Sequence, residues 1–132
     1  MDRTSLLRTT YRINAAATLV CGLGLLAAGH LLAPLFAVPA AALWGLGAFF
    51  LPFAAWIWSI SRREQLRWSE AAIAGLLDGA YALVSFVALA EFWTRMTPEL
   101  RIAIALVAAP VALFAAAELG SALRLRSSPA VA

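Results

Sequence analysis

The residue best placed to do chemistry in this sequence is Asp78, which lies within the apolar stretch "AGLLDGAYALV" (74–84). No other charged residue occurs within seven positions before it or twelve positions after it. A carboxylate in such surroundings can exchange a proton, bind a ligand, accept hydrogen bonds that join helices, or contact a partner subunit. The solvent around this segment and the neighbours of Asp78 decide between these roles.

Helical spacing predicts which polar side chains lie near Asp78. Tyr81 follows it at i+3, on the same face of a helix. The first apolar segment of the chain carries a similar polar stripe, because Asn14, Thr18 and Cys21 repeat at i, i+4 and i+7. Two such faces can meet inside a helical bundle, and we expect the polar groups on them to come together there.

Two further charged residues are predicted in the inner half of the bundle. Glu118 precedes Arg124 by about 9 Å along a helix, at a rise of about 1.5 Å per residue. Arg12 comes directly before the first apolar segment. We therefore predict a polar cluster in the inner half of the bundle, formed by Arg12, Asn14, Asp78, Tyr81 and Glu118.

This predicted cluster has a structural and a functional interpretation. In the structural interpretation, Asp78 forms a hydrogen bond to Asn14 or Tyr81 and has no role beyond holding helices together. Such interhelical hydrogen bonds within membranes contribute about 0.6 kcal/mol each. In the functional interpretation, Asp78 is an exchangeable carboxylate, and Glu118 and Arg12 stand at its inner entrance. Ionisable residues inside a membrane mark proton or substrate pathways in many proteins.

A second pair of titratable residues is predicted at the other end of the spans. His30 and Glu91 both lie near the outer interface, where long polar side chains reach toward water. The single Cys21 excludes an intrachain disulfide and a multi-cysteine metal site. We expect no metal and no cofactor, and no nucleotide-binding or hydrolase motif occurs in the sequence.

Composition shows which solvent surrounds these residues. The chain has 132 residues, of which 64% are hydrophobic and 13% are charged. An ordinary soluble domain has about 25% charged residues. A soluble domain of this size buries too little surface to hide so many apolar side chains, so the sequence predicts an integral membrane protein.

Four segments are long enough to cross a bilayer, whose hydrocarbon core of about 30 Å requires about 20 apolar residues. They lack the period-two alternation of a transmembrane barrel, so helices are predicted. We expect an all-α, antiparallel four-helix bundle as a single domain over 1–126, followed by a disordered tail over 127–132. The predicted spans are 13–33, 41–60, 71–92 and 102–123.

Two links carry local signals of helix ends. Pro34 and Pro39 bracket the first link and predict that the helix is interrupted there. Thr97, Pro98 and Glu99 form a typical helix start, with a capping hydroxyl, a proline at the first helical position and an acid in the first turn.

The distribution of arginine predicts the orientation in the membrane. Eight of the ten arginines lie before the first span, in the link 61–70 or after the last span, and these three regions share one side of a four-span chain. The positive-inside rule places that side, with both termini, in the cytoplasm. Four tryptophans fall near the two interfaces, as in an aromatic belt, namely Trp44 and Trp93 on one side and Trp58 and Trp68 on the other.

These observations favour a small, non-enzymatic, multi-pass protein of a bacterial inner (plasma) membrane with a structural or complex-accessory role. The alternative is a small proton-coupled transporter or channel that uses Asp78 as its exchangeable carboxylate. The expected partners are the lipid bilayer and either further copies of the chain or a larger membrane complex. Nucleic acid is not expected, because the arginines are dispersed and lie beside apolar segments.

Overall fold

The computed structural model describes residues 3–127, which form four long helices and one short 3₁₀ turn. The all-helical prediction is confirmed, and each of the four helices is long and apolar enough to cross a membrane. Ser127 ends the last helix, and the rest of the predicted disordered tail, 128–132, lies outside the described residues. The elements are α1 (Arg3–Phe36), α2 (Ala40–Ser61), α3 (Trp68–Phe92), η1 (Trp93–Arg95) and α4 (Pro98–Ser127).

The helices extend beyond the predicted spans, most clearly at the start of α1, and α4 extends equally at both of its ends. Hydropathy marks where apolar side chains end, whereas a helix continues as long as its backbone hydrogen bonds do. The polar ends of α1 and α4 therefore reach past the apolar segments that the sequence indicates.

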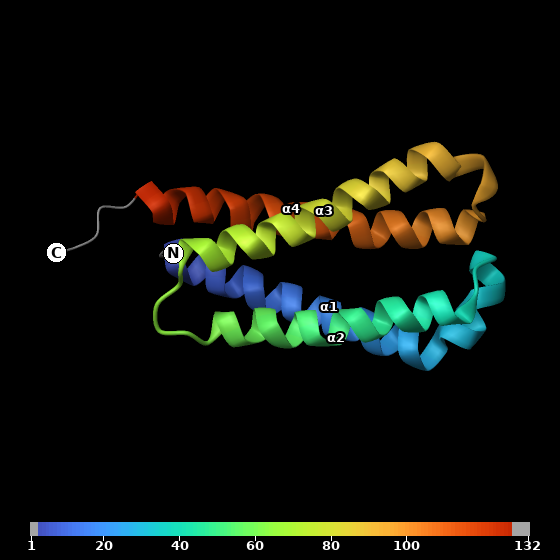
Figure 1. The fold of residues 1–132 in the computed structure, drawn as a ribbon, viewed down its shortest axis with the longest axis horizontal. Helices are drawn as coiled ribbons and strands as arrows, with labels where there is room; N and C mark the ends of the chain where they lie inside the picture. The colour runs from blue at the N-terminus through green and yellow to red at the C-terminus, as the bar shows by residue number, and fades with distance from the viewer. Residues whose placement is uncertain (1–2, 128–132) are drawn as a thin grey trace.

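The helices lie side by side as two hairpins, α1 with α2 and α3 with α4 (Figure 1). The hairpins meet mainly where α1 contacts α4. The start of α1, the link 62–67 and the end of α4 lie together at one end of the molecule, on the left of Figure 1. We call this the arginine-rich end, and the end formed by the α1–α2 turn and η1 the opposite end.

A close backbone contact holds the first hairpin together. A Cβ added to Gly47 would lie 2.8 Å from the carbonyl oxygen of Gly22, and one added to Gly22 would lie 3.1 Å from the carbonyl oxygen of Gly47. Lipid tails are as apolar as the helix surfaces, so van der Waals contact between close backbones is a main source of helix association in membranes. Glycine at both positions allows α1 and α2 to approach this closely.

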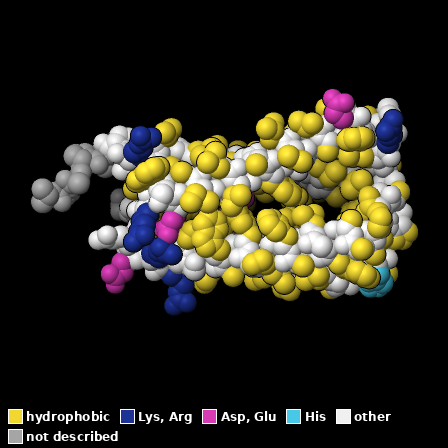
Figure 2. Space-filling model, viewed as in Figure 1, with side chains coloured by type: hydrophobic (Ala, Val, Ile, Leu, Met, Phe, Trp, Pro, Cys, Tyr) yellow, Lys and Arg dark blue, Asp and Glu magenta, His cyan; other side chains and the backbone are white. Residues whose placement is uncertain are grey.

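The outer surface is apolar along the middle of the helices and charged at both ends (Figure 2). Large apolar side chains are exposed there, and Leu113 of α4 retains 72% of its surface. Exposing so much apolar surface to water is unfavourable, at about 25 cal/mol per Å², whereas acyl chains solvate it well. The tryptophans of the predicted belt are all exposed near helix ends: Trp44, Trp58, Trp68 and Trp93.

The first turn differs from the prediction at one proline. Pro34 lies inside α1, which continues to Phe36, so the helix is interrupted after Phe36, between the two prolines, and not at Pro34 itself. A proline within the last helical turn disturbs few backbone hydrogen bonds, because the helix stops soon after it. The chain leaves the helix at Ala37, whose φ of 52° is left-handed, and Pro39 directly precedes α2.

The predicted start of the last helix is confirmed. Pro98 is the first residue of α4, and the Thr97 hydroxyl accepts a hydrogen bond from the backbone N–H of Leu100 at 3.2 Å. The same hydroxyl donates to the carbonyl oxygen of Leu35 at 2.8 Å. Thr97 therefore caps α4 and also fastens the second hairpin to the end of α1.

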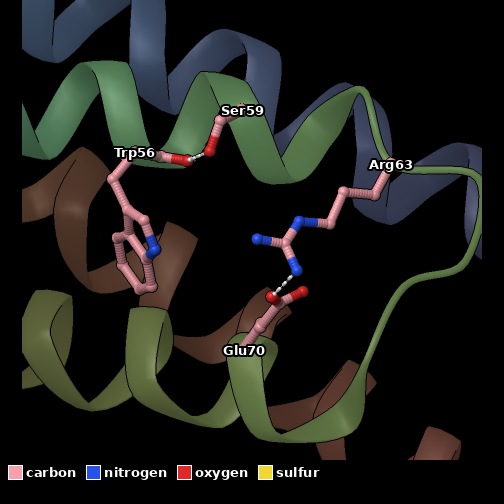
Figure 3. A network of polar contacts seen from close by, with 4 residues as sticks. All are labelled: Trp56, Ser59, Arg63 and Glu70. Atoms are coloured by element: carbon pink, nitrogen blue, oxygen red, sulfur yellow. Dashed lines mark hydrogen bonds and ion pairs between the residues drawn. The ribbon is translucent and has the colours of Figure 1, made fainter.

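Arginines hold the link between the hairpins at the arginine-rich end. Arg8 of α1 donates to the carbonyl oxygens of Ser61 at 3.1 Å and Glu64 at 2.7 Å. Figure 3 shows Arg63 reaching from the link to Glu70 in the first turn of α3, with which it forms an ion pair. Beside it, the Ser59 hydroxyl donates to the carbonyl oxygen of Trp56 at 2.6 Å, within α2.

Candidate functional site

The central feature of the interior is one amide shared by two carboxylates. Asn14 Nδ2 donates to Asp78 Oδ2 at 2.6 Å and to Glu118 Oε1 at 3.1 Å. Asn14 and Glu118 are fully buried, and Asp78 retains 5% of its surface. We call these three residues the Asn14 triad; they come from α1, α3 and α4, so one side chain connects three helices.

Both N–H groups of the Asn14 amide are in use, and its oxygen accepts one hydrogen bond. Its two N–H groups serve the two carboxylates, and its Oδ1 accepts a hydrogen bond from the Thr18 hydroxyl at 3.1 Å. Thr18 lies one helical turn further along α1. This bond to Thr18 fixes the orientation of the amide, with its nitrogen toward the acids.

Small residues allow the three helices to bring the triad together. Ala15 and Ala74 are buried close to Asn14 and Asp78 along the chain, and Ala122 lies one turn after Glu118. All three alanines belong to the same buried cluster. Side chains of this size leave room for close helix contact around polar groups.

Three buried oxygen atoms lack a hydrogen-bond partner among the described residues: Glu118 Oε2, Tyr11 Oη and Glu70 Oε2. The carboxylates of Glu118 and Glu70 both lie within electrostatic reach of the Tyr11 hydroxyl. Buried polar groups are normally hydrogen-bonded to protein or to ordered water, so each of these three oxygens has capacity for a water molecule. They extend from the first turn of α3 toward the Asn14 triad.

Tyr11 also belongs to this interior, although the predicted cluster did not include it. Its ring is fully buried in the core between the helices. It precedes Asn14 by three positions and therefore extends the polar stripe of α1 by one turn. The signal was present in the sequence, but the predicted span began after Tyr11.

The predicted cluster also contained Arg12, and the structure does not place it there. The Arg12 side chain is exposed. Consecutive residues of an α-helix are rotated by about 100° from each other, so Arg12 points away when Tyr11 faces the interior. Tyr11, and not the predicted Arg12, therefore faces the interior at this end of α1.

Tyr81 lies beside the triad without joining its hydrogen bonds. Its ring packs edge-on against Phe50 of α2, with centroids 5.7 Å apart. Tyr81 and Asp78 line the same cavity. Of the five residues predicted to cluster, the structure thus joins Asn14, Asp78 and Glu118 by hydrogen bonds, places Tyr81 next to them and leaves Arg12 outside.

The two titratable residues predicted near the outer interface do not bond to each other. His30 on α1 and Glu91 on α3 are both exposed, and no hydrogen bond or ion pair within residues 3–127 joins them. Their helices belong to different hairpins, which meet mainly through α1 and α4. Each side chain is free to reach the interface separately.

A cavity of about 150 Å³ lies between the two hairpins, with walls from all four long helices. Figure 2 shows the hollow that separates the hairpins on this face. The cavity lies on the side of the triad that faces the opposite end, because its α1 wall begins at Ala17 and includes Cys21. Its aromatic walls are Phe49, Phe50, Phe53, Tyr81 and Phe114.

Asp78 connects the polar and apolar parts of the interior. It accepts a hydrogen bond from Asn14 and is the one charged side chain that lines the cavity. The other titratable groups facing this region are Tyr11 and Cys21 from α1, Tyr81 from α3 and Glu118 from α4. The α2 wall contributes phenylalanines and no titratable group.

Within residues 3–127, no group of three or more His, Cys, Asp or Glu side chains is arranged to hold a metal ion. The groups that do gather are two carboxylates, an amide and a phenol, which can hold and pass protons and bind cations. Comparison with models of known protein families, with curated proteins and with solved structures finds no match.

Proposed function

We propose that this chain is a small multi-pass membrane protein in which Asp78 and Glu118 form a proton-exchanging site within a proton-coupled transporter or channel. The observation that supports this most directly is the shared amide: both buried carboxylates depend on Asn14 Nδ2. The proposal is non-enzymatic, because the site only binds and releases ligands and protons.

Electrostatics favours a single negative charge on this pair. The two acceptor oxygens lie 2.6 Å and 3.1 Å from the same nitrogen, so they are no more than about 6 Å apart, and two unit charges at that distance repel by about 3 kcal/mol at an effective dielectric constant of about 20. One hydrogen bond to a charged group stabilises by about 1.5–3 kcal/mol, and each acid has one from Asn14. A repulsion of at least this size offsets that gain, so we expect the pair to share a proton, as neighbouring carboxylates do in other proteins.

The unpaired oxygens supply a route for that proton. Glu70 lies in the first turn of α3, where Arg63 pairs with its other oxygen. The Tyr11 hydroxyl is within electrostatic reach of both Glu118 and Glu70, and Glu118 Oε2 is the unpaired atom within the triad. A hydroxyl both donates and accepts hydrogen bonds, so Tyr11 can relay a proton between the carboxylates of Glu70 and Glu118.

The proposed setting is an antiparallel four-helix bundle in a bacterial inner membrane with both termini in the cytoplasm. Eight of the ten arginines occur in the three regions that form the arginine-rich end, which supports this orientation. The proton route then begins at the cytoplasmic side. Pro52 and Pro110 interrupt the hydrogen bonding of α2 and α4 and provide places where the cavity walls can bend.

The proposal is tested by proton uptake in proteoliposomes that contain the purified protein and a pH-sensitive dye. Asp78→Asn keeps an oxygen that accepts from Asn14 but cannot exchange a proton. We expect it to fold as the parent does and to lose proton uptake driven by a pH gradient, and Glu118→Gln to behave in the same way.

Glu91→Gln is the matched control, because Glu91 is an exposed acid on the same helix as Asp78. It should retain proton uptake. Infrared spectra provide an independent readout, since a buried protonated acid has a carbonyl stretch that Asp78→Asn removes. Equal proton uptake by the parent and Asp78→Asn would refute the proposal.

A structural or complex-accessory role is the second candidate, and it is supported by the position of Asn14 between three helices. In that case the triad serves to connect the hairpins, and the protein acts by assembling with itself or with a larger membrane complex. Loss of folded protein in Asp78→Asn and Glu118→Gln, without any separable proton uptake, would favour this role.

A further inference from the structure

We propose that the cavity between the hairpins binds a small hydrophobic amine, with its aromatic or aliphatic body among the phenylalanines and its ammonium group against Asp78. This inference rests on the proposed function, because an acid that releases its proton can bind a cation in its place. It assigns a ligand class to the site.

The size and walls of the cavity suit the body of such a ligand. Its volume is about 150 Å³, and an apolar protein cavity of about that size accommodates one benzene ring. Phenylalanines from two helices form much of the wall, including Phe50 and Phe53 of α2 and Phe114 of α4. The cavity is therefore matched to a single ring or a short hydrocarbon.

The charge of the cavity selects a cation. Asp78 is the one charged side chain among the lining residues, and no arginine lines the cavity. Its Oδ2 is held by Asn14, which fixes the carboxylate at the polar end of an otherwise apolar space. A neutral guest leaves this acid without a counter-charge, whereas an ammonium group supplies one and donates a hydrogen bond to it.

The aromatic walls add to this selectivity. The face of an aromatic ring attracts cations, most strongly where water is excluded. The Tyr81 ring packs edge-on against Phe50 close to Asp78, so a ring lies beside the position of the ammonium group. An anion of the same size in the cavity would lie against the Asp78 carboxylate and electron-rich ring faces, and both would repel it.

The test uses two probes of nearly equal shape, 4-fluorobenzylamine and 4-fluorobenzyl alcohol. Binding is followed by ¹⁹F NMR with the full-length protein in nanodiscs of zwitterionic lipid, and empty nanodiscs give the partition background. We expect saturable binding of the amine to the parent protein. Asp78→Asn should weaken amine binding by about tenfold or more and leave the binding of the alcohol unchanged.

Cavity filling supplies a second variant, because it does not involve the acid. Val111→Phe places a larger side chain in the cavity wall, and binding of both probes should be lost. Leu113→Phe is its matched control on the same helix, since Leu113 points outward. This control should bind both probes as the parent does.

Cys21 gives a readout in the parent protein that requires no substitution. It is the single cysteine and lines the cavity. The amine should slow alkylation of Cys21 by monobromobimane, and the alcohol should do so less.

Amine binding that is unchanged in Asp78→Asn, or absent from the parent, would overturn the inference. Proton uptake distinguishes that failure from failure of the proposed function. If the parent takes up protons but binds no amine, the ligand assignment is wrong and the proton site remains. If amine binding depends on Asp78 but no proton is exchanged, the proton site is wrong.

Discussion

Asn14 and Asp78 lie 64 positions apart in sequence, and their side chains are joined by a hydrogen bond of 2.6 Å. They belong to different hairpins, and this bond is part of the contact that holds the hairpins together. The same Asn14 nitrogen reaches Glu118 on α4. Several properties of the protein should therefore depend on this one amide.

Replacing Asn14 by Leu removes the shared donor and leaves two buried carboxylates facing each other. We expect a loss of stability of about 1–3 kcal/mol, the cost of leaving buried polar groups unsatisfied. The loss should be larger at alkaline pH, where both acids ionise and repel, and smaller at acidic pH, where they are neutral. Thermal unfolding in detergent across a pH series measures this, and a pH-independent loss would contradict the shared-proton pair.

Replacing Gly47 by Leu should force α1 and α2, the two helices of the first hairpin, further apart. A Cβ there lies 2.8 Å from the carbonyl oxygen of Gly22, so the backbones must move apart. Overpacking of this kind costs about 1–3 kcal/mol. Gly45→Ala is the control, since a Cβ on Gly45 meets nothing within 4 Å. Thermal unfolding of the two variants should differ clearly; equal unfolding temperatures would show that the glycine contact is unimportant.

Replacing Arg8 by Ala should release the link between the hairpins, because Arg8 donates to the carbonyl oxygens of Ser61 and Glu64. Limited digestion with trypsin should then cut the link 62–67 faster than in the parent. Arg12→Ala is the control, since Arg12 is exposed on the same helix. Equal digestion rates in all three proteins would show that the Arg8 bonds do not hold the link.

The orientation proposed for the chain predicts the behaviour of fusion reporters. Alkaline phosphatase, which is active only outside the cytoplasm, should be inactive when fused after Arg126. It should be active when fused after Val38, in the turn between α1 and α2. The reverse pattern would place the arginine-rich end outside and would invert the direction of the proton route.

The sequence by itself determined the number of helices and their apolar character. Four apolar segments of sufficient length have few stable forms in lipid, because backbone groups must pair within the segment. The inward position of Asp78 followed from the same reasoning, since an ionised acid facing acyl chains costs at least about 2.5 kcal/mol. The sequence also predicted that Thr97 caps the last helix, because the residues at a helix start act locally.

Tertiary structure decided which groups meet. The sequence indicated that Asn14 or Tyr81 would be the partner of Asp78, and packing placed Asn14 between Asp78 and Glu118. Helix packing also buries Tyr11 and leaves Arg12 exposed. The rotation of each helix about its axis is poorly encoded in an apolar sequence, because faces toward lipid and faces toward protein are similarly apolar. The cavity arises from the spacing of the two hairpins, which no single segment specifies.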